Sequence, residues 1–246
     1  MRIVQWATLA SVALMVASCR SDPGITPEEA QELLTEVRAL RQELNARPPP
    51  QAAQSPRRPE SLSVSIDGRP ALDRADAKLT IVEFTDYQCP YCKAFKGGTL
   101  EELKRSYVDT GVAKLVIYDL PLPIHPQAAK AAEAARCAGD QGKYWEMHDQ
   151  LFADGRRLAV EDLKNHADAV GLDQRRFSDC LDGGKFADSV RKDVVAALEL
   201  GVGGTPTFVL GREDSGNVSG KVLRGALPLG AFKTEIERLI GDGSTR

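Results

Sequence analysis

The sequence is poor in the residues on which metal and nucleic-acid chemistry depend. Its 246 residues include three scattered histidines, five cysteines and a single Cys-x-x-Cys pair, so a structural zinc site lacks ligands. The formal net charge is −3, and the chain has no stripe of basic and aromatic residues and no glycine-rich phosphate loop. These absences argue against nucleic acid as a partner. We expect neither a metal nor a bound cofactor.

The chain also lacks an uninterrupted apolar run of the roughly 20 residues that a confident membrane span needs. Its N-terminal apolar stretch, residues 3–17, follows Arg2 and leads into Val16-Ala17-Ser18-Cys19, which has the pattern of an export signal. These four residues resemble a bacterial lipoprotein signal (residues 1–18), whose cleavage leaves Cys19 as the lipidated N-terminus. Arg20 in the next position, rather than aspartate, favours the outer membrane. A plain secretory signal is the alternative, and either one predicts an exported protein of the cell envelope or periplasm.

Four cysteines are left when Cys19 is set aside. Two of them, Cys89 and Cys92, form the Cys-x-x-Cys pair, and the others are Cys137 and Cys180. An even number of cysteines in an oxidising compartment suggests pairing. We therefore expect a structural disulfide between Cys137 and Cys180, with two buried inert thiols as the alternative.

The most informative segment is Cys89-Pro90-Tyr91-Cys92. It follows an apolar run, residues 79–84, that is typical of a strand buried on both faces, and it precedes a helical pattern over residues 93–108. This order places Cys89 at a helix N-terminus, where free N–H groups and the helix dipole stabilise a thiolate. Cys92 falls one turn inward and is shielded. We expect a redox-active pair in which Cys89 attacks and Cys92 resolves.

Two spacer elements separate the signal from this segment. Thr26-Pro27-Glu28-Glu29 has the pattern of a capping box, and apolar residues then recur at heptad spacing in the predicted helix of residues 26–46. Fewer than three to four heptads are present, so the helix is either a short coiled coil that forms a homo-oligomer or a solitary solvated spacer. Residues 47–60 hold five prolines and predict a semi-rigid extended linker.

Residues 61–246 are enough for one domain with an embedded subdomain. Strands are predicted at residues 62–66, 79–85, 112–118, 207–210 and 218–224. Helices are predicted at 127–138, 144–152, 160–170, 173–181 and 186–200, with a closing helix at 229–240. Strands that flank a block of helices predict an α/β fold with a second, all-helical lobe.

Three motifs carry a family resemblance. The segment Val82 to Cys92, the Pro121-Leu-Pro-Ile-His-Pro126 turn and the Gly204-Thr-Pro-Thr-Phe208 segment together resemble the DsbA-like branch of the thioredoxin superfamily. The resemblance covers residues 61–246. It implies a thioredoxin-like fold with an inserted helical subdomain at about residues 126–201, a cis-proline at Pro206 opposite the cysteines, and thiol-disulfide oxidoreductase activity.

Two further positions have physical reasons to support such a site. The backbone groups of Thr205, freed by a cis bond to Pro206, can pair with an extended substrate beside Cys89. Glu83 lies inside the apolar strand, where family members carry a buried acid. Burial there raises a carboxyl pKa and would let Glu83 exchange a proton with Cys92. A trans loop proline and a solvent-facing glutamate are the alternatives. Asp86 is interpreted as a helix cap and His125 as a turn residue.

The direction of electron flow is left open by the sequence. Strongly oxidising family members carry histidine where this chain has Tyr91, so we expect a milder oxidant, and Pro90-Tyr91 also resembles the dipeptide of reducing glutaredoxins. We expect an oxidase that exchanges disulfides with exported proteins and is recycled by a membrane redox partner. A reductase or isomerase using the same site is one alternative. The other is a lipid-tethered binding module in which the cysteines only staple the fold.

Overall fold

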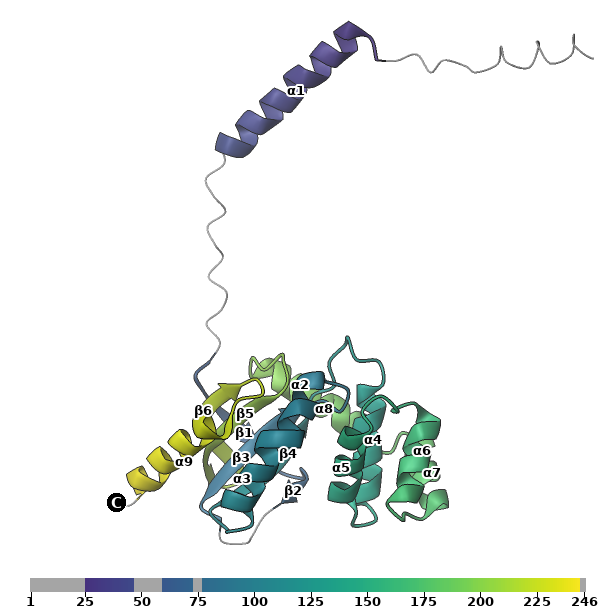
Figure 1. The fold of residues 1–246 in the computed structure, drawn as a ribbon, viewed down its shortest axis with the longest axis vertical. Helices are drawn as coiled ribbons and strands as arrows, with labels where there is room; N and C mark the ends of the chain where they lie inside the picture. Colours follow the sequence, from purple (N-terminus) through teal and green to yellow (C-terminus); the bar gives the residue numbers. More distant parts are fainter. Residues whose placement is uncertain (1–24, 47–58, 73–76, 244–246) are drawn as a thin grey trace, which may run out of the picture. The chain divides into compact units, whose positions relative to one another are not determined.

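The structure, a computed structural model, describes residues 25–46, 59–72 and 77–243 (Figure 1). They belong to two compact units, residues 1–57 and 58–246. The predicted signal peptide, Cys19 and most of the proline-rich linker lie outside the described residues. None of the described helices is long and apolar enough to cross a membrane.

The first unit contributes one described element, helix α1 (Pro27–Ala46). Its N-terminus has the predicted capping box. The Thr26 backbone N–H donates to Glu29 Oε2 (2.8 Å), and the Glu29 N–H donates to Thr26 Oγ1 (3.2 Å). These reciprocal bonds satisfy two N–H groups at the helix entrance and fix where α1 begins.

The second unit is built around a mixed six-stranded sheet in the order β1-β6-β5-β3-β4-β2. Its strands are β1 (Ser61–Ser65), β2 (Ala71–Leu72), β3 (Leu79–Thr85), β4 (Ala113–Asp119), β5 (Thr207–Asp214) and β6 (Asn217–Arg224). Strand β3 runs parallel to β4 and antiparallel to β5. All seven of its residues are buried, as the continuous apolar run predicts.

A helical segment follows β3 and begins at Pro90, three residues before the predicted start. It consists of α2 (Pro90–Phe95), a π-helical stretch η1 (Lys96–Leu100), α3 (Glu101–Leu103) and a second π-helical stretch η2 (Lys104–Val108). The earlier start agrees with the preference of proline for the first helical position. Cys89 is therefore the N-cap residue itself.

Five helices are inserted between β4 and β5, and one closes the chain. The inserted helices are α4 (Ala128–Gly139), α5 (Tyr144–Ala153), α6 (Val160–Ala169), α7 (Gln174–Asp182) and α8 (Ala187–Glu199), and the last is α9 (Leu229–Gly243). Helices α4 to α7 gather beside the sheet in Figure 1. The predicted α/β fold with an all-helical insertion is confirmed.

The two faces of the sheet belong to different cores. Leu79 and Ile81 of β3 pack in the larger core, with α2, the inserted helices and α9, whereas Val82 and Phe84 pack in the smaller core beside α8. Side chains alternate along a strand, so Glu83 lies on the same face as Leu79 and Ile81. That is the face covered by α2 and its two cysteines.

Buried charges join the helical insertion to the sheet. Arg136 of α4 donates from Nε to Asp119 Oδ2 at the end of β4 (2.6 Å) and from Nη2 to Asp193 Oδ2 of α8 (2.5 Å). Arg69, from the segment between β1 and β2, donates to Asp193 Oδ1 (2.9 Å) and to the Tyr118 hydroxyl (2.7 Å). Paired in this way, the buried Asp119, Arg136 and Asp193 are not buried singly, and the partly exposed Arg69 completes the network.

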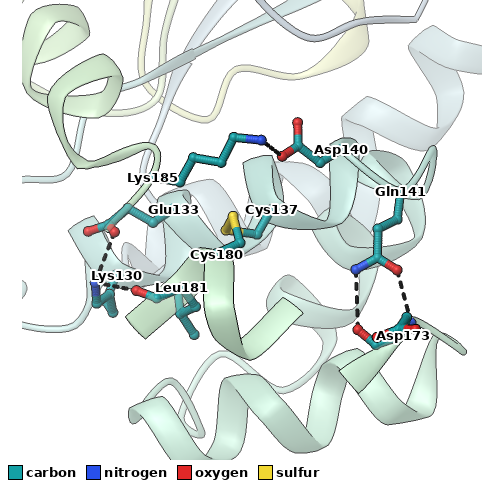
Figure 2. The surroundings of a disulfide bond; sticks show 9 residues. All are labelled: Lys130, Glu133, Cys137, Asp140, Gln141, Asp173, Cys180, Leu181 and Lys185. Carbon is teal, nitrogen blue, oxygen red and sulfur yellow. Dashed lines mark hydrogen bonds and ion pairs between the residues drawn. A yellow bond between two sulfur atoms is a disulfide. The ribbon is translucent and has the colours of Figure 1, made fainter. Parts of the chain in front are cut away.

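A disulfide holds the insertion together internally. Cys137 of α4 is bonded to Cys180 of α7, 43 residues later in the chain. Figure 2 shows the contacts around it. Lys130 Nζ donates to the Leu181 carbonyl (3.0 Å), and Gln141 exchanges two hydrogen bonds with the backbone of Asp173. Helices α4 and α7 are thus joined by one covalent bond and several polar contacts.

Candidate redox site

The cysteine pair is placed by the β3–α2 junction. Strand β3 ends at Thr85, a turn of three residues follows, and Cys89 caps α2 with extended backbone angles (φ −72°, ψ 122°). Both thiols are free and buried, with Cys92 fully so. Pro90 and Tyr91 between them are exposed, so the outer end of the pair lies at the surface.

A second segment approaches Cys89 from 116 residues away in sequence. Cys89 Sγ lies 3.6 Å from the carbonyl oxygen of Thr205, to which it donates only while it is protonated, and the Thr205–Pro206 peptide bond is cis. The Pro206 carbonyl accepts from the Gly225 N–H (2.8 Å), which ties this segment to the end of β6. Strand β5 begins at the next residue, Thr207, so the position of the segment is set by the sheet.

The two thiols have opposite electrostatic environments. A hydrogen bond from the Cys92 thiol is the main cause that lowers the pKa of Cys89, to about 5, and the backbone groups of Tyr91 and Cys92 add to it. Burial raises the pKa of Cys92 far above its usual range, and the nearby Glu83 and Cys89 raise it further. At neutral pH the outer sulfur is thus a thiolate and the inner one a thiol. This asymmetry is what a nucleophile and its resolving partner require.

Glu83 is buried rather than solvent-facing, being 1 % exposed. Burial raises the pKa of its carboxyl to about 7. Its Oε2 has no hydrogen-bond partner among the described residues. A buried carboxyl that changes protonation near neutral pH, on the sheet face beneath Cys92, fits a proton donor and acceptor.

Asp86 has a larger role than the helix cap that the sequence predicts. Its Oδ1 accepts from the N–H groups of Gln88 (2.8 Å) and Cys89 (3.1 Å). Its Oδ2 accepts from the Leu122 N–H (2.8 Å) and lies 2.7 Å from His125 Nδ1. One buried carboxylate therefore joins the Cys89 turn to the 121–126 turn. The second set of partners is 36 to 39 residues distant, and no local sequence signal indicates it.

Other titratable side chains of the domain lie outside the reacting centre. Tyr87 is buried, and its hydroxyl is hydrogen-bonded to that of Tyr144 (3.1 Å). His148 is buried between Tyr87 and Phe152, and burial lowers its pKa. His166 accepts or donates only within the helical insertion, next to Gln150 and the Arg157 carbonyl. The described part of the chain contains no group of three or more His, Cys, Asp or Glu side chains that would hold a metal ion.

Comparison with known protein families gives one match. Residues 68–227 match the family model described as Thioredoxin. The matched span begins before β2 and ends just before α9. It contains Cys89, Cys92, Glu83 and the Thr205–Pro206 segment.

The chain is also similar to known relatives and to solved structures. The chain is 39 % identical over 154 residues to the Na(+)/H(+) antiporter NhaA 3 of Salinispora tropica, but it spans only 23 % of that protein against 62 % of itself. The crystal structure of Wolbachia pipientis alpha-DsbA1 superposes with a TM-score of 0.64 at 22 % identity, covering 73 % of this chain and 94 % of the other. Pseudomonas aeruginosa DsbA2 superposes with a TM-score of 0.53 at 28 % identity, covering 69 % and 92 %.

Proposed function

This chain belongs to the thioredoxin family, and we propose that it is a thiol-disulfide oxidoreductase with Cys89 and Cys92 as its redox pair. The observation that carries the proposal is the asymmetry of the two sulfurs. Cys89 is the N-cap of α2 with a lowered pKa, and Cys92 is buried with a raised one. The redox chemistry of the protein resides in a disulfide between Cys89 and Cys92 and needs no bound cofactor.

We propose net oxidation of exported proteins. A substrate thiolate attacks Cys89 Sγ of the oxidised pair, a substrate–Cys89 disulfide forms, and Cys92 leaves with its electron pair. A second substrate thiolate then attacks the substrate sulfur of that mixed disulfide and releases Cys89 as a thiolate. The substrate loses two electrons and gains a disulfide, while the protein ends as a dithiol. A membrane redox partner must reoxidise it.

The segment around Thr205 is suited to hold the substrate. Its carbonyl oxygen lies 3.6 Å from Cys89 Sγ, so a peptide laid beside Thr205 would bring its own sulfur next to that of Cys89. Exposed Tyr91 follows Cys89 by two residues in the sequence.

Glu83 is proposed to move the proton of Cys92. Because the pKa of Cys92 is high, its thiolate leaves slowly unless a proton arrives, and the protonated Glu83 carboxyl supplies one. In the reverse step the Glu83 carboxylate removes that proton, and Cys92 can attack the mixed disulfide.

Glu83→Gln is expected to slow release of the mixed disulfide by Cys92 roughly tenfold or more, because glutamine cannot transfer the proton. The wild-type rate of this step should rise as the pH passes through about 7, where Glu83 loses its proton, and the variant should lack that rise.

The pH dependence of protein stability gives an independent test of the Glu83 pKa. A carboxyl whose pKa is raised by folding stabilises the folded state at pH values below its pKa in the unfolded chain. This stabilisation is lost as the pH rises through its pKa in the folded protein. Wild type should therefore lose stability relative to Glu83→Gln between about pH 4.5 and pH 7. Identical pH–rate profiles would rule out the proton transfer.

The direction of exchange is tested by the reduction potential of the pair. A stabilised Cys89 thiolate favours the reduced protein, so we expect a potential less negative than about −200 mV in glutathione buffers. A value near −270 mV, as in thioredoxin, would instead assign the chain to reduction or isomerisation. A pair that never exchanges with glutathione would indicate the third possibility, a binding module stapled by its cysteines.

We also propose that the chain is exported and lipid-anchored through Cys19, with the outer membrane as its site. This rests on the sequence of residues 1–20, which lies outside the described structure. Labelled palmitate should be incorporated by the wild type and not by Cys19→Ser. Equal labelling of the two would contradict the anchor.

A further inference from the structure

Helix α1 presents an apolar face that no other described part of its own unit covers. Leu33, Leu34, Val37 and Leu40 are between 50 % and 58 % exposed. Most helical stability in proteins comes from packing an amphipathic face against a partner rather than from helix propensity. The capping box fixes the start of α1 but buries none of this face.

The apolar residues of α1 follow a heptad. With Ala30 and Val37 at position a, Leu33 and Leu40 fall at position d, and Leu34 falls at the flanking e position. The outward positions b, c and f are polar or small: Gln31, Glu32, Thr35, Arg38, Ala39 and Gln42. We propose that α1 pairs with α1 of a second copy of this chain as a parallel two-stranded coiled coil. Valine at a with leucine at d favours two strands.

The charged residues that flank the apolar seam of α1 favour a parallel arrangement of the two helices. The g positions are Glu29, Glu36 and Glu43, and Arg41 is at e of the heptad after Glu36. In a parallel pair, g faces e of the following heptad in the partner, so each Glu36 meets an Arg41, twice per dimer. In an antiparallel pair, g faces g and glutamates would oppose one another. Neither Glu36 nor Arg41 has an ion-pair partner among the described residues, so both are available.

This pairing is independent of the redox chemistry proposed above, because α1 belongs to a different unit from the cysteine pair. Its consequence is that one particle carries two Cys89/Cys92 pairs. The partner is identified by its chemistry as a second copy, since only an identical helix offers both the same seam and the complementary Glu36–Arg41 contacts.

Single-cysteine cross-linking in the full chain tests the arrangement. In a Cys89→Ser/Cys92→Ser background, which removes exchange with the redox pair, Ala30→Cys and Val37→Cys are each introduced and membranes are treated with diamide. A parallel pair brings both same-residue positions together, so each variant should give a band of twice the chain mass on a non-reducing gel. An antiparallel pair cannot align both. Thr35→Cys, at the outward f position, is the matched control and should stay monomeric, as should the background without an added cysteine. Equal cross-linking at residues 35 and 37, or none at 30 and 37, would overturn the proposal.

Charge exchange and mass test the remaining features. Glu36→Arg and Arg41→Glu should each reduce the Val37→Cys cross-linked fraction several-fold, and the double exchange should restore it, because it recreates opposite charges across the seam. Leu40→Asp should abolish it. Sedimentation equilibrium of the full chain in density-matched detergent should give twice the mass of one chain. A single-chain or three-chain mass, or a double exchange no better than either single one, would contradict a parallel pair.

Discussion

Replacing Cys92 by alanine is expected to trap covalent complexes between Cys89 and substrate proteins. In the proposed exchange, Cys92 of the wild type attacks the mixed disulfide and releases the substrate, and without its sulfur that route is closed. Cys89 keeps its place at the N-terminus of α2, so its thiolate can still attack a disulfide of a substrate protein. One substrate sulfur then leaves as a thiolate, and the other stays bonded to Cys89. Acid-quenched, thiol-blocked cells expressing the variant should show several high-mass species on a non-reducing gel, and all should disappear with reductant.

The matched control is Cys89→Ala. Cys92 is fully buried with a strongly raised pKa, so it cannot replace the lost nucleophile. This variant should form no complexes and should show no measurable exchange with a reduced model protein, the largest effect expected of any substitution in the chain. Complexes that form equally in both variants, or in neither, would contradict the assignment of attacking and resolving roles.

Removing the Cys137–Cys180 disulfide is expected to lower the free energy of unfolding by about 4 kcal/mol. The bond closes a loop across 43 residues, and on the chain-entropy model a cross-link of this span restricts the unfolded chain by about that amount. The polar contacts between α4 and α7 in Figure 2 do not depend on it, so the native packing should persist in Cys137→Ala/Cys180→Ala. Urea unfolding of the double variant should show a lower midpoint with a near-native circular dichroism spectrum.

The redox pair supplies the comparison for this measurement. Cys89 and Cys92 close a loop of only four residues, so on the same model Cys89→Ala/Cys92→Ala should lower the stability of the oxidised protein by about 2 kcal/mol, half as much. An unchanged urea midpoint for Cys137→Ala/Cys180→Ala would show that the bond does not constrain the unfolded chain. The exchange activity of that variant below its unfolding midpoint should be close to wild type, because neither sulfur approaches Cys89.

The parts of this fold that could be predicted from sequence have local signals. The continuous apolar run of residues 79–84 predicts a central strand, and β3 is central and fully buried. Glycines predict the ends of α6 and α8, where Gly171 and Gly201 have positive φ values of 71° and 75°. The sequence does not predict the two-residue strand β2, because two residues are too few to show the alternation of apolar and polar side chains that marks a strand. Strand β5 extends to Asp214, four residues beyond the predicted apolar stretch. Its backbone pairing with β6 continues after the burial of its side chains ends.

The residues of the candidate site also divide into those with a local sequence signal and those without one. The positions of Cys89 and Cys92 relative to α2 follow from adjacent residues and could be predicted. The approach of Thr205 depends on the family resemblance, because it lies 116 residues from Cys89 and on the far side of the five inserted helices in the sequence. The sequence predicts only a helix cap for Asp86 for a similar reason. Two of its four hydrogen-bond partners come from the turn at residues 121–126, which is distant in the sequence. Contacts that only the tertiary fold creates leave no periodicity to detect.

The pKa of Cys89 in the reduced protein is the most direct test of the account. Titration of the ultraviolet absorbance of its thiolate, with Cys89→Ser subtracted to remove the tyrosine signal, should give a midpoint near pH 5. A midpoint near 8.5, the value of an ordinary cysteine, would mean that neither α2 nor Cys92 activates this sulfur, and the proposed exchange chemistry would be contradicted.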